Sequence, residues 1–346
     1  MYVWDCKQKV ISMKRVLLGA IALFFTLVGN AQQDAQFSQN MFLNNAINPG
    51  ATGIKGMHCF NLIAREQWLG FEGRPETGML NYSGIVQNFG LGAVIVYDKI
   101  GFEQNVDFKI NGSFHLNIGD KGGKLGLGLD LGFLQKGFSG EGMKMFNPSD
   151  ASVAGLSGTS DIAFDLGAGA FYYVPNKLYF GISGQKLLPQ NHLLSNANLK
   201  VRPHGYITAG YYHDIPNMKL VLKPNMLVKT DLSTTQLDVN LTAEYQKLFW
   251  LGASYRVQDA VVANVGYNYY MNINGVQSRN PLKIGIAYDF TTQRLKDDGV
   301  FTFWKNGQVN DTKDNRSMGS VELYLGYCII PPPVPDFDIY VDPLFL

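Results

Sequence analysis

The stretch of residues 108–119, FKINGSFHLNIG, decides the fold class. Its apolar side chains occupy every second position, and the residues between them, such as Lys109 and His115, are polar. The apolar set is Phe108, Ile110, Phe114, Leu116 and Ile118. Successive side chains of a β-strand point to opposite faces, so this segment predicts a strand with one apolar and one polar face.

The same period of two recurs along the chain. Residues 236–246, QLDVNLTAEYQ, alternate apolar with polar side chains, and in residues 123–133, GKLGLGLDLGF, leucines alternate with Gly and Asp. Applied throughout, the pattern predicts an all-β chain of about fourteen strands, each of the length that a tilted transmembrane strand needs. They are expected near residues 57–67, 77–87, 89–98, 108–119, 123–136, 161–175, 177–187, 204–215, 220–230, 236–246, 248–258, 260–271, 282–290 and 320–329.

The gaps between these strands alternate in length. Long gaps are expected at 68–76, 99–107, 137–160, 188–203 and 291–319, and most of the gaps between them are short. Outer-membrane barrels have an even number of antiparallel strands, short periplasmic turns and long extracellular loops. Two gaps depart from this rule, because the turn at Asp259 is short for its side and 272–281 is long. One misplaced strand boundary would explain both.

Composition favours such a barrel and disfavours other classes. Only 16% of the residues are charged, against about a quarter in typical soluble domains. A formal net charge of +1 disfavours a nucleic-acid-binding protein. Mean hydropathy is −0.04, too low for a bundle of membrane helices but suitable for strands that alternate. Three Cys provide neither a disulfide-dense scaffold nor a zinc-ligand spacing.

Aromatic residues gather near the ends of the predicted strands, where barrels place aromatic girdles at the two membrane–water interfaces. A soluble β-sandwich or propeller would also alternate, but the long strands and these aromatics favour the membrane barrel. The residues are Phe171, Tyr172, Tyr173, Tyr179, Phe180, Tyr211, Tyr212, Phe249, Trp250, Tyr267, Tyr269 and Tyr270.

The beginning of the chain has the pattern of a secretory signal peptide. Basic residues precede the apolar run 16–29, and Gly29 and Ala31 provide small residues before a cleavage point at Gln32. We therefore expect residues 1–31 to be a signal peptide, with an N-terminal anchor helix as the alternative. Residues 32–56 are expected to form a pre-barrel segment, either periplasmic or a plug, and residues 57–329 the barrel.

Residues 330–346 are expected to form a Pro-rich periplasmic tail. Four prolines between 331 and 335 impose an extended course that is incompatible with a further strand. The apolar residues beyond them include Phe337, Tyr340 and Phe345, which would be costly to leave exposed. We expect this tail to dock on a partner or to fold into the barrel lumen.

Motifs for catalysis, cofactors and metals are lacking in the sequence. His115 is read as a lumenal polar residue, and the other His lack a metal-ligand spacing. No nucleophile elbow surrounds a Ser, and the glycines of residues 126–132 are read as small inward residues of a strand. We therefore expect no enzyme, no cofactor and no metal site.

Four further side chains have predicted positions. Arg65 and Arg256 are expected to face the lumen, where an ion pair is favoured over a substrate clamp. Cys59 and Cys328 fall in the first and last strands, which closure makes neighbours, although the two thiols could face opposite sides.

Two stretches resemble the PorP/SprF family of type IX secretion membrane proteins. Residues 32–53, QQDAQFSQNMFLNNAINPGATG, are similar to the mature start of that family, and residues 64–77, AREQWLGFEGRPET, to a later segment. The first match is carried by Phe37, Ser38, Gln39, Met41, Phe42, Asn48, Pro49 and Gly53. The second is carried by Arg65, Gln67, Trp68, Gly70, Phe71, Gly73 and Pro75.

The likeness continues through the last predicted strands and covers roughly residues 32–329. Residues 251–269 and 282–290 are similar to the final hairpins of the family. The residues that match there are Arg256, Gly266, Gly285, Tyr288 and Asp289. The family usually has a Ser-His-Glu-like element before its last strand, and here the sequence reads Gly319-Ser320-Val321-Glu322.

The resemblance implies an outer-membrane protein of a Bacteroidota-type bacterium that serves type IX secretion. It implies binding or retention of secreted adhesin-like cargo at the cell surface, and contact with secretion components and a periplasmic peptidoglycan-binding protein. The motif residues, together with Phe337, Tyr340 and Phe345 of the tail, are then candidates for partner binding or structure. The fold alone leaves two alternatives, a solute channel or hydrophobic-substrate transporter and, more remotely, an outer-membrane hydrolase.

Overall fold

The computed structural model describes residues 34–71, 73–119, 122–139, 159–193, 199–273, 276–292, 304–305, 308–309 and 318–330. The predicted signal peptide and residues 331–346 of the Pro-rich tail lie outside these residues. No helix in the described part of the chain is long and apolar enough to cross a membrane.

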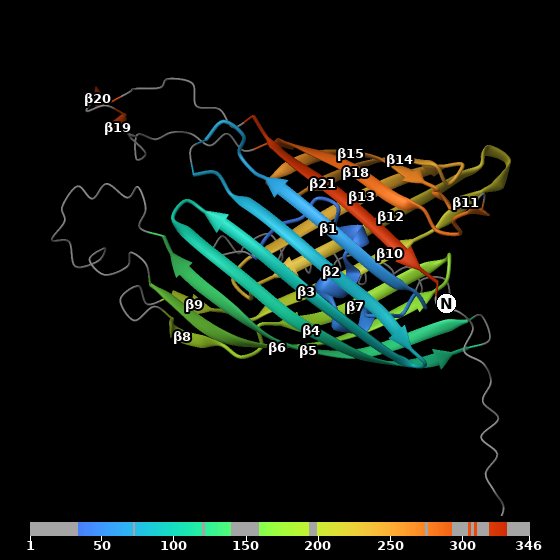
Figure 1. Ribbon diagram of the computed structural model, residues 1–346, viewed down its shortest axis with the longest axis horizontal. Helices are drawn as coiled ribbons and strands as arrows, with labels where there is room; N and C mark the ends of the chain where they lie inside the picture. Colours follow the sequence, from blue (N-terminus) through green and yellow to red (C-terminus); the bar gives the residue numbers. More distant parts are fainter. Residues whose placement is uncertain are drawn as a thin grey trace, which may run out of the picture.

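Antiparallel strands close into a fourteen-stranded barrel, as predicted (Figure 1). Each wall strand pairs with its neighbours in the chain, and β1 pairs with β21 to complete the ring. The wall consists of β1 (His58–Glu66), β2 (Glu76–Val86), β3 (Phe89–Ile100), β4 (Glu103–Ile118), β5 (Gly123–Phe138), β6 (Ser160–Val174), β7 (Leu178–Gln185), β10 (His204–Tyr211), β12 (Leu220–Thr230), β13 (Thr235–Tyr245), β14 (Phe249–Arg256), β15 (Ala260–Tyr269), β18 (Leu282–Thr291) and β21 (Ser320–Ile329).

The connections between the wall strands contain several short strands. β11 (His213–Ile215) pairs with β12 next to the end of β10, and η3 (Pro216–Met218) follows it. Three two-stranded sheets are formed by β8 (Gln190–Leu193) with β9 (Leu199–Val201), β16 (Asn272–Ile273) with β17 (Val276–Gln277), and β19 (Trp304–Lys305) with β20 (Gln308–Val309).

Alternation of the side chains places the apolar face outside. Leu129 and Leu131 of β5 are 61% and 64% exposed, whereas Asp130 between them is fully buried. The same contrast separates Ile110 from Lys109 in β4. An outward apolar and an inward polar face is the arrangement of a barrel surrounded by lipid.

The two ends of the barrel differ in the length of their connections. We call them the loop end, which carries the connections before β2, β6, β10 and β21, and the turn end, which carries the connections before β3, β7 and β14 (Figure 1). Both exceptions to the predicted alternation are real: residues 257–259 form a tight turn at the loop end, and 270–281 form a longer connection at the turn end.

Two predicted boundaries were wrong. The expected long gap 99–107 is the two-residue turn 101–102, because the β3–β4 hairpin continues beyond the apolar band with the mostly polar residues 103–107. The strand predicted at 204–215 is interrupted at Tyr212, whose backbone N–H donates to the carbonyl of Lys177 in the neighbouring turn.

The predicted aromatic girdle is only partly correct. Phe180, Tyr211 and Phe249 face outward, but Phe171, Tyr179 and Trp250 are buried inside the barrel. Neighbouring residues of a strand point to opposite faces, so an adjacent aromatic pair divides between the membrane side and the lumen.

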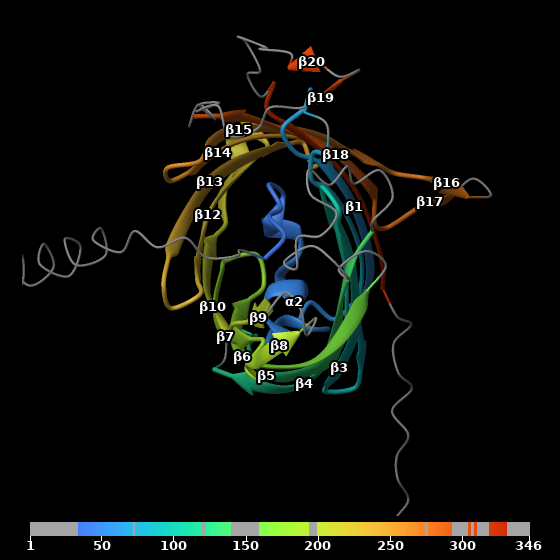
Figure 2. The ribbon, with the colours of Figure 1, turned by 90° about the vertical axis from the view of Figure 1, so that its left-hand side faces the viewer.

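Residues 34–57, which we call the lumenal segment, lie inside the barrel (Figure 2). Three single turns shape this segment: η1 (Asn40–Phe42), α2 (Asn44–Ile47) and η2 (Pro49–Ala51). It runs from the loop end, where Asp34 contacts β10, to the turn end, where β1 begins. The chain thus passes down the lumen once before it enters the wall.

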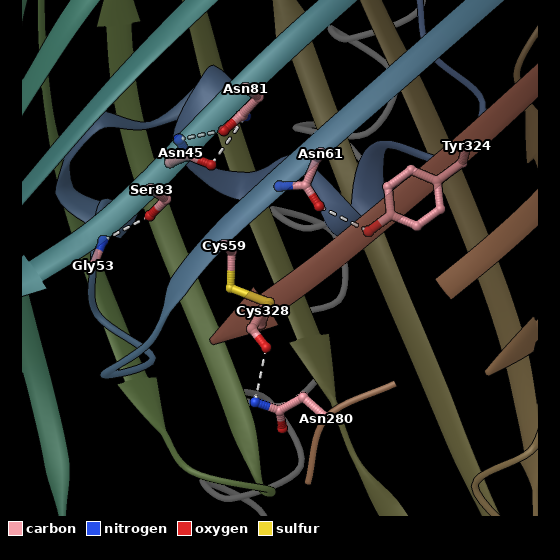
Figure 3. Close-up of a disulfide and its surroundings, with 9 residues drawn as sticks. All are labelled: Asn45, Gly53, Cys59, Asn61, Asn81, Ser83, Asn280, Tyr324 and Cys328. Atoms are coloured by element: carbon pink, nitrogen blue, oxygen red, sulfur yellow. Dashed lines mark hydrogen bonds between the residues drawn. A yellow bond between two sulfur atoms is a disulfide. The ribbon is translucent and has the colours of Figure 1, made fainter. Parts of the chain in front are cut away.

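A disulfide joins the first and last wall strands near the turn end (Figure 3). Cys59 and Cys328 are directly opposite each other in the β1–β21 ladder, so their side chains share one face. The alternative that the two thiols face opposite sides is therefore wrong.

A charge on the outer face should destabilise the barrel. We expect Leu129→Arg, at the middle of β5, to lower the free energy of unfolding by about 2–4 kcal/mol, because the cation would lie near the bilayer midplane. Leu232→Arg is the control, since Leu232 is an exposed residue of the outer turn between β12 and β13. Denaturant unfolding in lipid vesicles measures both, and equal stability of the two variants would contradict an outward-facing position of Leu129 in lipid.

The disulfide should also contribute measurably to stability. Its two ends are 269 residues apart in the sequence, so its loss restores much freedom to the unfolded chain. We expect the double variant C59S/C328S to lose about 2–5 kcal/mol of unfolding free energy. A reductant should destabilise the wild type to the same level and leave the variant unchanged. Equal free energies of unfolding for the oxidised wild type and the variant would show that strand pairing alone holds the β1–β21 seam, the ladder between the first and last wall strands.

Candidate functional site

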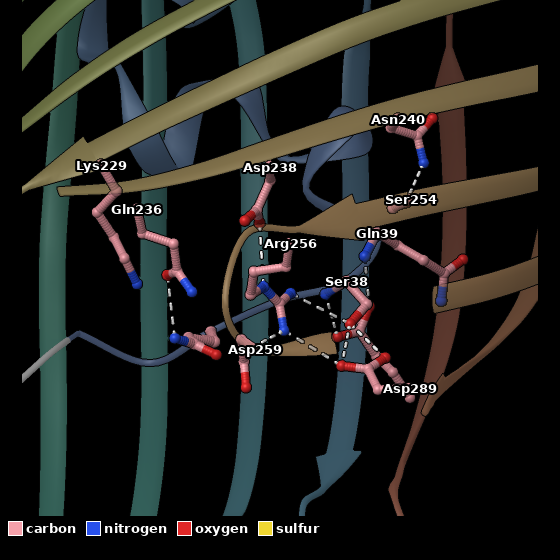
Figure 4. A network of polar contacts seen from close by, with 12 residues as sticks. Ser38, Gln39, Lys229, Gln236, Asp238, Asn240, Ser254, Arg256, Asp259 and Asp289 are labelled. Atoms are coloured by element: carbon pink, nitrogen blue, oxygen red, sulfur yellow. Dashed lines mark hydrogen bonds and ion pairs between the residues drawn. The ribbon is translucent and has the colours of Figure 1, made fainter. Parts of the chain in front are cut away.

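A buried cluster of charged side chains lies in the lumen at the loop end. Arg65 on β1 and Arg256 on β14 both point inward and approach Asp289 of β18, at Nη2–Oδ2 and Nη1–Oδ2 distances of 2.7 and 3.3 Å. Arg256 also pairs with Asp238 and with Asp259 (Figure 4). The inward orientation and the ion pairing of both arginines are as predicted.

The lumenal segment is bound to this cluster through Ser38 and Gln39. The Ser38 hydroxyl donates to Asp289 at 2.7 Å and accepts from Arg65 Nη1 at 2.7 Å. The backbone N–H groups of Ser38 and Gln39 donate to the two carboxylate oxygens of Glu322 at 2.7 and 2.8 Å. A buried carboxylate is tolerated when it is paired and hydrogen-bonded, and the lumenal segment supplies two of the donors that Glu322 needs.

A second anchor holds the first described residue of the segment. The carboxylate of Asp34 is ion-paired with Lys186 and accepts a hydrogen bond from the Tyr206 hydroxyl at 2.7 Å. Burial would raise the pKa of Asp34, but the charges of Lys186, His204 and Lys109 hold it well below its ordinary value. This contact therefore stabilises the segment at neutral pH, and its contribution is lost only as the pH falls below the ordinary carboxylate range.

Amide side chains hold the middle of the lumenal segment. Asn45 and Asn81 of β2 exchange two hydrogen bonds, at 2.8 and 3.0 Å (Figure 3). Asn48 donates to the carbonyls of Ala170 and Ile182 in the wall and accepts from the N–H of Gly50. These amides join the segment to the wall, and Asn48 also caps the backbone N–H of Gly50 at the start of η2.

Other inward side chains bind the backbone of the segment directly. Gln185 donates to the carbonyls of Ala46 and Ile47, and Ser113 and His115 both contact the carbonyl of Thr52. His115 is thus lumenal and polar, as predicted, but it is packed against the segment and not solvated.

Small inward residues make room for the segment. A Cβ on Gly128 would lie 2.3 Å from the carbonyl carbon of Pro49, and one on Gly126 would lie 2.0 Å from the carbonyl oxygen of Gly50. These glycines belong to the alternating Gly-Leu stretch of β5. Their lack of a side chain allows η2 to rest on the wall.

An apolar cluster completes the contact. Leu43 packs with Ile63, Met79, Val94 and Tyr324. Phe42 also stacks on the Tyr324 ring at 4.5 Å between centroids and meets the edge of the Trp250 ring at 5.7 Å. The candidate residue Phe37 packs on the edge of this cluster.

Beyond Arg65, the second motif leaves the lumen and forms an outer loop. Trp68 is about one third exposed and has φ of 53°, a conformation that is uncommon for a bulky residue. Backbone hydrogen bonds hold this loop. The N–H of Gln67 donates to the carbonyl of Pro75, and the N–H of Phe71 to that of Trp68. Just before β21, the N–H of Leu69 donates to the carbonyl of Gly319, and the carbonyl of Leu69 accepts from the N–H of Met318. Gly70 has φ of +96°, which suits glycine.

The structure thus separates the candidate residues into an inner and an outer set. Ser38, Gln39, Asn48, Pro49 and Arg65 are all buried in the lumen. Gln67, Trp68, Gly70 and Phe71 lie in the outer loop at the loop end. Phe337, Tyr340 and Phe345 lie outside the described residues.

Several contact residues were not predicted from the sequence. Glu322 stands where the family has its Ser-His-Glu-like element, and Asn81, Lys186 and Tyr206 look like ordinary residues of strands or their ends. The sequence indicated their contact with the lumenal segment only through their inward position in the period-two pattern. Among the described residues, no group of His, Cys, Asp or Glu could hold a metal ion.

Comparison with known proteins gives one family and a set of similar folds. A family model described as "Type IX secretion system membrane protein PorP/SprF" matches residues 29–303. None of the curated proteins compared with the chain matches it significantly.

The similar solved structures include two toluene transporters and an outer-membrane protein. Ralstonia pickettii TbuX is 13% identical with a TM-score of 0.43, over 82% of this chain and 92% of that one. Pseudomonas putida TodX is 10% identical with a TM-score of 0.44, over 88% and 96%. Acinetobacter baumannii Omp33 is 6% identical with a TM-score of 0.43, over 79% and 99%.

Breaking the buried cluster should loosen the lumenal segment. We expect Arg65→Met to cost about 3–5 kcal/mol of unfolding free energy, because Asp289 and Glu322 would lose a buried cationic partner. Hydrogen exchange at the amides of Ser38 and Gln39 should accelerate in the same variant. Arg74→Met is the matched control, since Arg74 forms an exposed pair with Glu66 that is expected to contribute at most about 1 kcal/mol. Similar losses in both variants would contradict a specific role of the buried cluster.

Proposed function

Because the chain belongs to the PorP/SprF family of type IX secretion system membrane proteins, we propose that it is an outer-membrane accessory protein that binds or retains a secreted adhesin-like cargo at the cell surface. The family match over residues 29–303 is the observation that carries this proposal. It includes the lumenal segment and most of the wall. The protein is not an enzyme in this proposal, and its host is a Bacteroidota-type bacterium.

The filled lumen supports an accessory role over a solute channel or hydrophobic-substrate transporter. The lumenal segment is bound along its length, from Asp34 at the loop end to Thr52 near the turn end. Charged, amide and apolar contacts all hold it. A conducting pathway would require the loss of many of these contacts, whereas a partner-binding barrel benefits from a rigid interior.

The loop end is the expected side for cargo, since long loops of outer-membrane barrels face the exterior. There the outer loop with Trp68 is tied to the residues before β21, and Arg65 at the base of that loop holds Ser38 in the lumen. A partner on this loop would therefore contact a surface that is supported from inside. The turn end would then face the periplasm, where secretion components and a peptidoglycan-binding protein are the proposed contacts.

Affinity purification from outer membranes tests the proposal. Wild-type protein should recover a large secreted protein or other type IX secretion components. Trp68→Ala should reduce recovered cargo by about tenfold or more, the effect of removing a central aromatic residue from an interface. Phe102→Ala is the control, because Phe102 is an exposed aromatic of a neighbouring outer turn outside the motif.

Single-channel recording separates the proposed function from the channel alternative. We expect no stable conductance from the wild-type protein in planar bilayers. Stable conductance, together with failure to recover any secreted protein or secretion component, would contradict the accessory role and favour a channel.

A further inference from the structure

A lysine-lined cavity opens into the lumen at the turn end. Its volume is about 250 Å³, and it lies between the last part of the lumenal segment and the strands around the β1–β21 seam. The charged residues that line it are Lys55, Lys223, Lys247, Lys283 and Glu244.

The positive charge of this cavity is largely uncompensated. Lys223 is ion-paired with Glu244, but Lys55, Lys247 and Lys283 form no ion pair with any carboxylate in the described part of the chain. Lys283 Nζ instead lies 5.4 Å from the centroid of the Phe42 ring. Clustered cations of this kind attract a negatively charged group.

The C-terminal tail begins at the rim of the same cavity. Cys328 of β21 lines the cavity, is fixed by its disulfide to Cys59, and accepts a hydrogen bond from Asn280 on its carbonyl at 2.9 Å (Figure 3). β21 ends at Ile329, so the residues that follow it start beside the lysines.

The tail carries negative charges that can compensate the lysines of the cavity. Residues 331–346 contain Asp336, Asp338 and Asp342 and no Lys or Arg. The proline-rich start of the tail favours an extended chain with a rise of about 3.1 Å per residue, so that Asp336 can reach roughly 19 Å from Ile330. A segment tethered this closely also has a high effective concentration at the cavity, on the order of millimolar.

We propose that the acidic tail, residues 331–346, folds back onto the mouth of this cavity and pairs its aspartates with Lys55, Lys247 and Lys283. The apolar residues between the aspartates then meet the aromatic residues of the cavity wall, which include Tyr270 and Tyr324. This inference does not depend on the identity of the cargo.

Protease digestion of the tail in the purified full-length protein tests the proposal. The tail should be cut slowly at low salt and at least about fivefold faster in 0.5 M NaCl, because salt screens the ion pairs. The variant K55Q/K247Q/K283Q should be cut at least about fivefold faster than wild type at low salt, since the tethered tail loses its partners. Lys177→Gln is the matched control, because Lys177 lies in an exposed turn at the same end and does not line the cavity.

A second variant shows whether faster digestion comes from loss of the ion pairs or from misfolding of the barrel. D336N/D338N/D342N changes only the tail, and it should accelerate digestion as much as the lysine variant does. Combining K55E/K247E/K283E with D336K/D338K/D342K exchanges the charges between the two sets and should restore the slow rate. The proposal would be overturned if the tail of the wild type were digested as fast as the tails of both variants. It would also be overturned if the tail were protected only after another outer-membrane protein was added.

Discussion

Pairing of the buried charges at the loop end is the constraint on which the rest of this structure depends. Arg65, Arg256, Asp289 and Glu322 are shielded from water, where unpaired charges are costly. The wall residues alone do not satisfy them, because the Glu322 carboxylate accepts from Arg65 of the wall and also from the backbone N–H groups of Ser38 and Gln39. Wall and lumenal segment therefore complete each other, and we expect them to fold as one cooperative unit.

This constraint explains why the family motifs are spread along the sequence yet meet in one place. Ser38 and Arg65 belong to the two N-terminal motifs, and Arg256 and Asp289 to the final hairpins, but all four share one network. Figure 4 shows Ser38, Arg256 and Asp289 in this network. Most of the motif is thus internal structure. Its exposed part is the outer loop with Trp68, which the network supports from below, so a search for partner contacts should begin there.

The wall was predictable from the sequence because lipid enforces its pattern at every second residue. All fourteen strands were predicted, but the β3–β4 hairpin was predicted too short, because the mostly polar residues 103–107 extend it beyond the apolar band. The inward direction of Phe171 and Trp250 was missed, since an aromatic ring suits both an interface and a packed lumen. The contacts of Ser38 with residues more than 250 positions away depend on closure of the ring, and no local pattern in one sequence encodes that closure.

The β1–β21 ladder, which closes the ring, carries a functional residue pair near each of its ends. Arg65 and Glu322 are opposite each other in this ladder at the loop end, and Cys59 and Cys328 are opposite each other near the turn end. One pair binds the lumenal segment, and the other fixes the point from which the acidic tail departs beside the lysine cavity. Closing the ring therefore creates both binding surfaces at once: neither Glu322 nor Cys328 has its partner until the last strand meets the first. For this reason we expect the lumenal segment to become ordered together with ring closure and not as a separate, later insertion.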